Sequence, residues 1–206
     1  MKKLELGFSL SFIILCFLTQ TGCATMDRSE CQVANWQIIG MEDGAAGRPS
    51  SYIGNHRSAC AEHGIAPNLQ QYLVGHNEGL KQYCTYDRGL SLGRSGGGYN
   101  GVCPANLSKG FKRGFNKGHR EYLVRSKIAS TKSELDSLHR KLQQIETDIQ
   151  KKEAQLIAQG TSVETRRALL VEIRVLREEK EDIERELPVL ESELFRLEEQ
   201  YARLRR

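Results

Sequence analysis

The chain has 206 residues and a formal net charge of +4, and nearly all of its 19 glycines lie before residue 119. Its charge is positive over residues 23–130 and slightly negative over residues 131–206. This composition identifies neither a substrate nor a reaction. After the N-terminus, no stretch is apolar over the roughly 20 residues that a membrane-spanning helix needs.

The N-terminus has the form of a secretory signal peptide, which we assign to residues 1–22. A basic start precedes a mostly apolar stretch, Leu6–Leu18, that is too short to span a bilayer. The following Thr21-Gly22-Cys23 resembles the lipobox of bacterial lipoproteins, although that family favours Leu where this chain has Gln20. The resemblance implies cleavage before Cys23 and lipidation of that cysteine. The alternative is ordinary secretion, with cleavage near Ala24 or later.

The residue after the cysteine bears on location. By resemblance to enteric sorting rules, Ala24 in this position implies delivery to the outer membrane. We therefore expect the protein on the periplasmic face of the outer membrane of a Gram-negative bacterium, with the inner membrane or the soluble periplasm as alternatives. Several acyl chains would hold it there, because one chain alone anchors only marginally.

Besides Cys23 and one cysteine in the signal peptide, four cysteines remain. In an exported chain this number predicts two disulfides, with three possible connectivities. If helices near residues 35–46 and 51–62 form an antiparallel pair, the first two cysteines meet at one end, and the last two flank a connection between helices. We predict the disulfides Cys31–Cys60 and Cys84–Cys103.

Residues 23–125 form a glycine-rich helical domain in this interpretation. Residues 72–83 match residues 111–122 in the pattern aromatic-x-x-Gly-aromatic/His-Asn-x-Gly-x-basic-x-Tyr, and residues 36–44 form a fainter third copy. Glycines four apart share one face of a helix and let another backbone approach closely. We expect packed helices here, the alternative being glycines in loops. Residues 85–103, between the two clear copies, are expected to form a disulfide-closed loop.

The domain carries an ordered set of glycines, aromatics and cysteines. Its members are Trp36, Gly40-x-x-Asp43-Gly44-x-x-Gly47, His56-x-x-x-Cys60, Gly64, the repeat ending Tyr83-Cys84, Tyr99-x-Gly101-x-Cys103-Pro104 and the repeat that begins at Phe111. This set resembles a family of bacterial lipoproteins known as domain of unknown function 2799. The resemblance implies an envelope lipoprotein and implies no activity.

No residue is assigned a catalytic role, and the sequence predicts no cofactor and no metal site. Candidate ligand contacts are Asp43, His56, Tyr72 and Tyr99, the last on an exposed part of the expected loop. No second carboxylate is recognisable beside Asp43. Its alternative role is therefore that of a buried, hydrogen-bonded residue that fixes a helix junction.

Residues 126–206 carry two heptad runs, separated by a break near residues 159–162. Apolar residues recur every three or four positions from Val124 to Leu156 and from Leu169 to Leu204, with a few polar exceptions such as Lys180. A short connection predicts an antiparallel coiled-coil hairpin. The alternatives are a compact bundle and a parallel homodimeric coil.

Three details of the hairpin are also predicted. The register places Ile149 opposite Leu169, a capping box at Thr161–Glu164 begins the second helix, and Pro188 kinks or restarts it. The predicted fold is thus all-α: a small disulfide-linked, glycine-rich head followed by a long hairpin.

These features favour a non-catalytic, lipid-anchored scaffold or adaptor that binds an envelope protein, or itself, through the hairpin. The alternative is a ligand-binding or enzymatic head, with the coiled coil used for dimerisation. Basic residues gathered between Lys109 and Lys127 favour contact with anionic lipid or cell-wall polymer, a solvated helix face being the alternative. An exported protein is not expected to bind nucleic acid.

Overall fold

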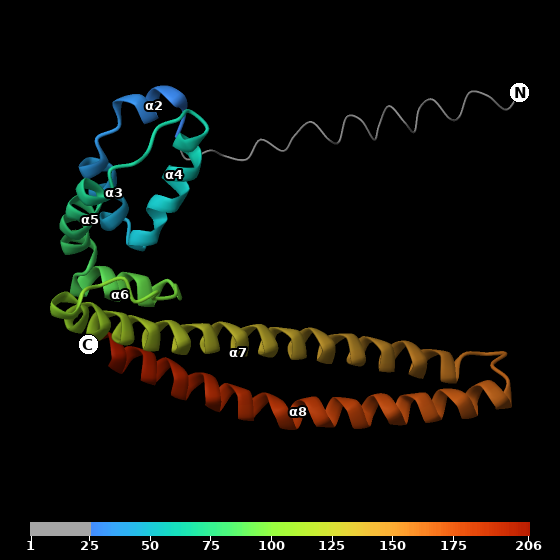
Figure 1. The fold of residues 1–206 in the computed structure, drawn as a ribbon. Coiled ribbons are helices and arrows are strands. Elements are labelled where there is room, and N and C mark those ends of the chain that lie inside the picture. Colours follow the sequence, from blue (N-terminus) through green and yellow to red (C-terminus); the bar gives the residue numbers. More distant parts are fainter. Residues whose placement is uncertain (1–25) are drawn as a thin grey trace, which may run out of the picture. The chain divides into compact units, whose positions relative to one another are not determined.

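The computed structural model describes residues 26–206, so the predicted signal peptide (residues 1–22) and the predicted lipidation site Cys23 lie outside the described residues. The described part is all-α, as predicted, and contains no strand. None of its helices combines the length and apolarity required for a membrane span. It divides into two compact units, which meet in the chain between Tyr83 and Cys84 (Figure 1).

This division differs from the predicted domain boundary near residue 125. Helix α7 spans Ala105–Ile157 without interruption and therefore passes through that position. The composition changes there because α7 exchanges one packing partner, α6 (Tyr86–Arg94), for another, α8 (Val163–Arg205).

Between residues 26 and 83, the first unit is built from four α-helices and one 3₁₀ turn. Its disulfide joins Cys31 to Cys60, which ties the first helix to the helix after the turn. Trp36 and Tyr72 are buried in its core. The elements are α2 (Arg28–Val33), α3 (Trp36–Ala45), η1 (Ser50–Tyr52), α4 (Ile53–Ala61) and α5 (Leu69–Tyr83).

Helices α3 and α5 pack with their backbones in contact. Gly40 and Gly44 of α3 lie against carbonyl oxygens of α5, and Gly75 and Gly79 of α5 lie against carbonyl oxygens of α3. A Cβ at any of the four would overlap with an oxygen of the partner backbone. Only glycine therefore permits this approach, which agrees with the packed-helix prediction.

The second unit begins with the same construction. Gly89 and Gly93 of α6 lie against carbonyl oxygens of α7, and Gly114 and Gly118 of α7 lie against carbonyl oxygens of α6. The prediction of a loop over residues 85–103 is therefore wrong for the α6 segment. Its glycines were interpreted as helix breakers, whereas they form the contact face of a helix.

The two helix pairs, α3/α5 and α6/α7, are two copies of one arrangement. After the first helix of each pair, a glycine with positive φ packs under a tyrosine ring: Gly47 (74°) under Tyr83 and Gly96 (77°) under Tyr122. In each copy a disulfide joins the segment before the first helix to the connection between the helices. The faint third repeat at residues 36–44 is thus the partner helix of the first clear one.

The second disulfide joins Cys84 to Cys103. Both cysteine pairs are those given by the sequence analysis.

From Val124 onward, α7 and α8 form the hairpin. Leu135, Ile145, Ile173 and Ile183 are buried at the interface between them, and Thr131, a polar exception, is buried there as well. Six ion pairs join the two helices along their flanks: Lys127–Glu193, Lys132–Glu198, Lys141–Glu179, Lys152–Glu172, Arg177–Glu153 and Lys180–Glu146. The predicted periodicity is therefore the interface that the folded chain uses.

The register of the hairpin differs from the prediction by one heptad. The predicted register would place Lys180 opposite Leu138, whereas its amine lies 2.8 Å from the carboxylate of Glu146, two helical turns away. Leu156 also shares a pocket with Ile173, so Leu156 rather than Ile149 lies opposite Leu169. Heptad patterns shifted by seven residues bury the same kinds of side chain, so the pattern alone does not select between them.

The turn of the hairpin also departs from the prediction in detail. Gly160 has φ of 85°, and α8 is capped by Ser162, whose side chain accepts from the Thr165 amide, and not by Thr161. The Thr161 hydroxyl instead donates to the carbonyl of Gln155. Helix α8 continues past Pro188 without a restart, and Pro188 lies on the exposed outer face.

Candidate functional site

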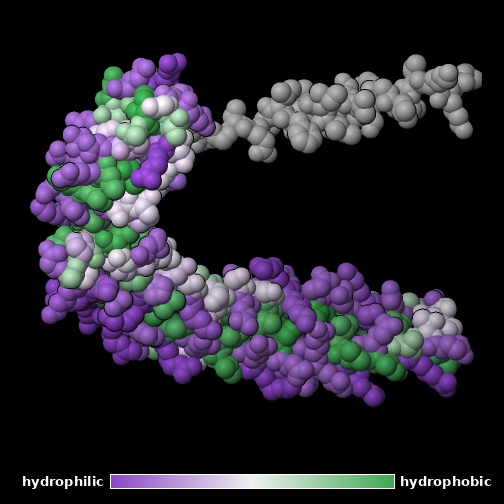
Figure 2. Space-filling view, viewed as in Figure 1, coloured by the Kyte–Doolittle hydropathy of each residue, from purple (hydrophilic) through white to green (hydrophobic). Residues whose placement is uncertain are grey.

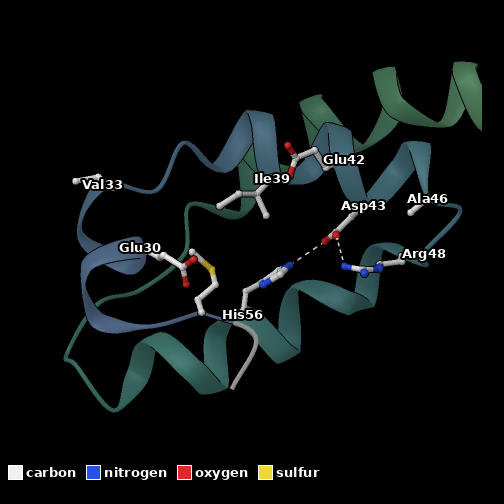
Figure 3. Close-up of a pocket in the computed structure, with 9 residues that line it drawn as sticks. Glu30, Val33, Ile39, Glu42, Asp43, Ala46, Arg48 and His56 are labelled. Carbon is white, nitrogen blue, oxygen red and sulfur yellow. Dashed lines mark hydrogen bonds and ion pairs between the residues drawn. The ribbon is translucent and has the colours of Figure 1, made fainter. Parts of the chain in front are cut away.

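The polar residues of the first unit converge on Asp43, whose side chain is only 4% exposed. One oxygen, Oδ2, accepts from the Tyr72 hydroxyl at 2.7 Å and from His56 Nε2 at 2.9 Å. The other, Oδ1, accepts from Arg48 Nη1 at 2.8 Å. Figure 3 shows His56 and Arg48 directed at Asp43 from two sides. We call Asp43, Arg48, His56 and Tyr72 the Asp43 cluster.

Each member is brought in by a backbone feature. The positive-φ turn at Gly47 ends α3 and returns Arg48 toward Asp43. The Arg48 carbonyl is itself held by His76 Nε2, at 2.8 Å. The close approach at Gly40 places α5, and with it Tyr72, next to α3. The glycine contact therefore positions the polar cluster as well as packing the helices.

The electrostatics of the cluster follow from burial. Burial, and then the hydrogen bond to Asp43, raise the pKa of Tyr72 above its usual value, so its hydroxyl remains a donor at neutral pH. A carboxylate only accepts, so His56 carries its proton on Nε2. Its Nδ1 is buried and has no hydrogen-bond partner among residues 26–206. In the neutral ring this atom is therefore an unsatisfied acceptor.

A pocket of about 480 Å³ lies beside the cluster (Figure 3). Asp43, Arg48 and His56 form its polar part, and the carboxylates of Glu30 and Glu42 also line it. Its apolar part consists of Met26, Val33, Ile39 and Ala46. This combination of apolar walls and a few fixed polar groups is typical of small-ligand sites. Within residues 26–206, no group of three or more His, Cys, Asp and Glu side chains is arranged to hold a metal ion.

Three of the four candidate ligand contacts, Asp43, His56 and Tyr72, are thus brought together. The fourth, Tyr99, belongs to the second unit and is half-buried rather than exposed. Its ring packs on Phe111, with centroids 4.7 Å apart, and its hydroxyl accepts from the Cys103 amide at 3.2 Å. Tyr99 therefore supports the disulfide connection of its own unit.

Two features escaped the sequence analysis. Arg48 follows α3 and carried no pattern, yet it pairs with Asp43. In the second unit Glu121 is buried and held by two hydrogen bonds from Arg94, at 2.7 and 3.2 Å, which raise the pKa of that guanidinium. The sequence did contain one indication of this buried ion pair: Glu121 is the only acidic residue on the helix face that carries Gly114 and Gly118.

The fold and the site define a class: an all-α protein that combines a duplicated, glycine-packed helix pair with a coiled-coil hairpin. Residues 35–120 match the family model described as "Protein of unknown function (DUF2799)". The match supports the resemblance to that family stated above. The match begins at the N-cap of α3 and spans both helix pairs. Neither a curated protein nor a solved structure matches the chain significantly.

Proposed function

We propose that this protein is a lipid-anchored scaffold or adaptor of the cell envelope that binds a partner protein through its hairpin. The proposal is supported by how the hairpin is closed. Its interface is buried and its flanks are joined by ion pairs within one chain. A second copy is therefore not needed to complete the coiled coil, and the outer surface is left for another molecule.

The observation that carries the proposal is a group of exposed apolar side chains near the turn, which occupy more than one face of the hairpin. We call them the distal apolar patch: Ile157, Val163, Leu170, Val171 and Val175, which are 54–80% exposed. By contrast Leu169 and Ile173, which face α7, are 6% and 4% exposed. Figure 2 shows apolar surface near this end of the hairpin. Apolar side chains gathered on an otherwise charged helix surface are typical of a protein-binding site.

The surroundings of the patch indicate the chemistry of the partner. A pocket of about 570 Å³ opens beside it, lined by Leu156, Leu170 and Ile173. Its rim carries charges of both signs, including Arg174 and Glu181. An amphipathic helix with an apolar stripe between charged residues fits such a groove.

Crosslinking in cells tests this proposal. A photoreactive residue at Val171 or Val175 is expected to give one recurring protein adduct, identified by mass spectrometry. Val189 is the matched control, because it is equally exposed, at 63%, but lies in another part of α8. The substitution Val175→Asp should abolish the adduct formed from Val171. Adducts to a second copy of the chain alone, or equal adducts from Val189, would refute the scaffold.

A second function is favoured by the pocket and by the unpartnered His56 Nδ1: binding of a small ligand that donates a hydrogen bond. Ala46→Phe should narrow the pocket while leaving the Asp43 cluster in place. Ligand-observed NMR with a fragment library would then find amine or hydroxyl fragments that bind the wild type and not the variant. If no fragment binds at millimolar concentration, or if binding is unchanged in the variant, the pocket is not a ligand site.

A further inference from the structure

The N-terminal part of α7 carries a row of cations on one face. Lys109, Arg113, Lys117 and Arg120 follow one another at intervals of four, four and three residues, which places them on one side of a helix. We call these four residues the basic stripe. The residues that pack on α6, among them Gly114 and Gly118, lie on the other side of the helix. The stripe spans about 16 Å at the rise of an α-helix.

The charges of the basic stripe are not neutralised. No Asp or Glu occurs in the sequence between Asp87 and Glu121, and Glu121 is buried and bound to Arg94. Among residues 26–206, no carboxylate lies within ion-pair distance of any stripe residue.

Cations further along the hairpin behave differently. Lys132, Lys141 and Lys180 each pair with a glutamate of the opposite helix, at 2.6–2.8 Å. The basic stripe is therefore not a continuation of the ion-paired hairpin flank.

An exposed leucine adjoins the basic stripe. Leu123, on the flank of the stripe, is 53% exposed. Cations with an adjacent exposed leucine are typical of surfaces that lie against lipid headgroups.

We propose that the basic stripe is a docking surface for the phosphate headgroups of an anionic bilayer. A rigid helix presents its cations in one direction, which matches a planar array of phosphates. Each Lys or Arg near such a surface strengthens binding about fivefold, so the four residues act together. The inference does not depend on the hairpin partner, because the stripe and the distal apolar patch share no residue and lie at opposite ends of the hairpin.

Vesicle binding tests the inference. The full chain with Cys23→Ser, which removes the expected lipidation site, is mixed with vesicles of phosphatidylcholine alone or with 30% phosphatidylglycerol, and the bound fraction is measured by sedimentation. The test variant is Lys109→Gln/Arg113→Gln/Lys117→Gln. The matched control is Lys132→Gln/Lys141→Gln/Lys180→Gln, which changes the net charge equally at ion-paired positions.

The wild type should prefer the anionic vesicles, and that preference should fall about 100-fold in the test variant but less than about fivefold in the control. Raising the salt concentration should remove the preference. An equal loss in both variants would show that net charge alone acts, and would overturn the proposal. So would absent vesicle binding combined with retention on isolated cell-wall sacculi, which would assign the stripe to an anionic polymer.

Discussion

The α3/α5 and α6/α7 pairs share a backbone arrangement but differ in what it encloses. Asp43 stands directly before Gly44, and Leu92 stands at the same place before Gly93. Likewise Tyr72, whose hydroxyl reaches Asp43, corresponds to Phe111, which has no hydroxyl. The glycine contacts are nevertheless the same in both pairs. The helix crossing therefore does not require the polar cluster, which is a separate feature of the first pair.

The buried carboxylates show the same contrast. Glu121 of the second pair is held by one arginine, whereas Asp43 is held by three side chains and lies beside a pocket. Buried charges must be paired, and one partner is enough at Glu121. The additional partners at Asp43 make the first unit the better candidate for ligand binding.

Replacing Asp43 tests whether the first pair tolerates the apolar interior of the second. Asp43→Leu should lower the free energy of unfolding of the first unit by about 3–5 kcal/mol, because the donors of Tyr72 and His56 lose their acceptor. Adding Tyr72→Phe to Asp43→Leu should lower the free energy of unfolding only slightly further. This corresponds to a coupling energy of about 1–3 kcal/mol between the two residues. Urea unfolding followed by fluorescence of Trp36, the chain's one tryptophan, measures the first unit. Glu42→Leu on the exposed side of α3 is the control, and strictly additive losses would contradict the cluster.

Removing the disulfides compares the two units as wholes. Cys31→Ala/Cys60→Ala should lower the free energy of unfolding by about 3–4 kcal/mol. Cys84→Ala/Cys103→Ala should lower it slightly less, because its cysteines are 19 residues apart rather than 29 and a shorter loop gains less from the cross-link. Trp36 fluorescence should detect the first change, and far-UV circular dichroism should detect both. If each double variant shifts the Trp36 transition equally, the two units unfold as one and the comparison between them fails.

Glycine substitutions test the arrangement that the pairs share. Gly114→Ala should destabilise the second unit by about 2–3 kcal/mol, because its Cβ would meet the carbonyl of Tyr86. Gly75→Ala should have a similar effect in the first unit, where it would meet Gln37. Gly110, on the same helix as Gly114, has open space around its Cβ position. Gly110→Ala should therefore be neutral or stabilising by up to about 1 kcal/mol, and a loss as large as that of Gly114→Ala would refute the packing account.

The smallest expected effect is a dependence of the stability of the α3/α5 pair on alkaline pH. The folded-state pKa of Tyr72 is raised above the ordinary value of 10.0, so its contribution to stability is complete below pH 10 and is lost as the pH rises beyond it. The first unit should lose about 1 kcal/mol of unfolding free energy between pH 9 and pH 11 through this residue. Tyr72→Phe should remove that loss, as measured by Trp36 fluorescence. An unchanged pH dependence in the variant would assign the effect to other tyrosines.

Local patterns were sufficient for part of the fold. The heptads of α7 and α8, the glycine repeats and the cysteine positions all lie within short stretches, and each predicted its element. The α6 segment was missed because its glycines are breakers in isolation and become contacts only when α7 is present. Three of the four residues of the Asp43 cluster, Asp43, His56 and Tyr72, are candidates from the sequence alone. The fourth, Arg48, depends on a turn that the sequence did not reveal.

The sequence by itself determined that the chain is helical, that two glycine-bearing segments must pack closely, and that a hairpin follows. These properties depend on residue type and on spacing along the chain, which can be read from the sequence without knowing any tertiary contact. The tertiary structure decided which helix meets which, the register of the hairpin, and the convergence of three side chains on Asp43. These three features depend on competition between alternative helix packings that bury nearly the same apolar area. Which packing is most stable is decided by the fit between helix backbones and by ion pairs between residues far apart in the chain.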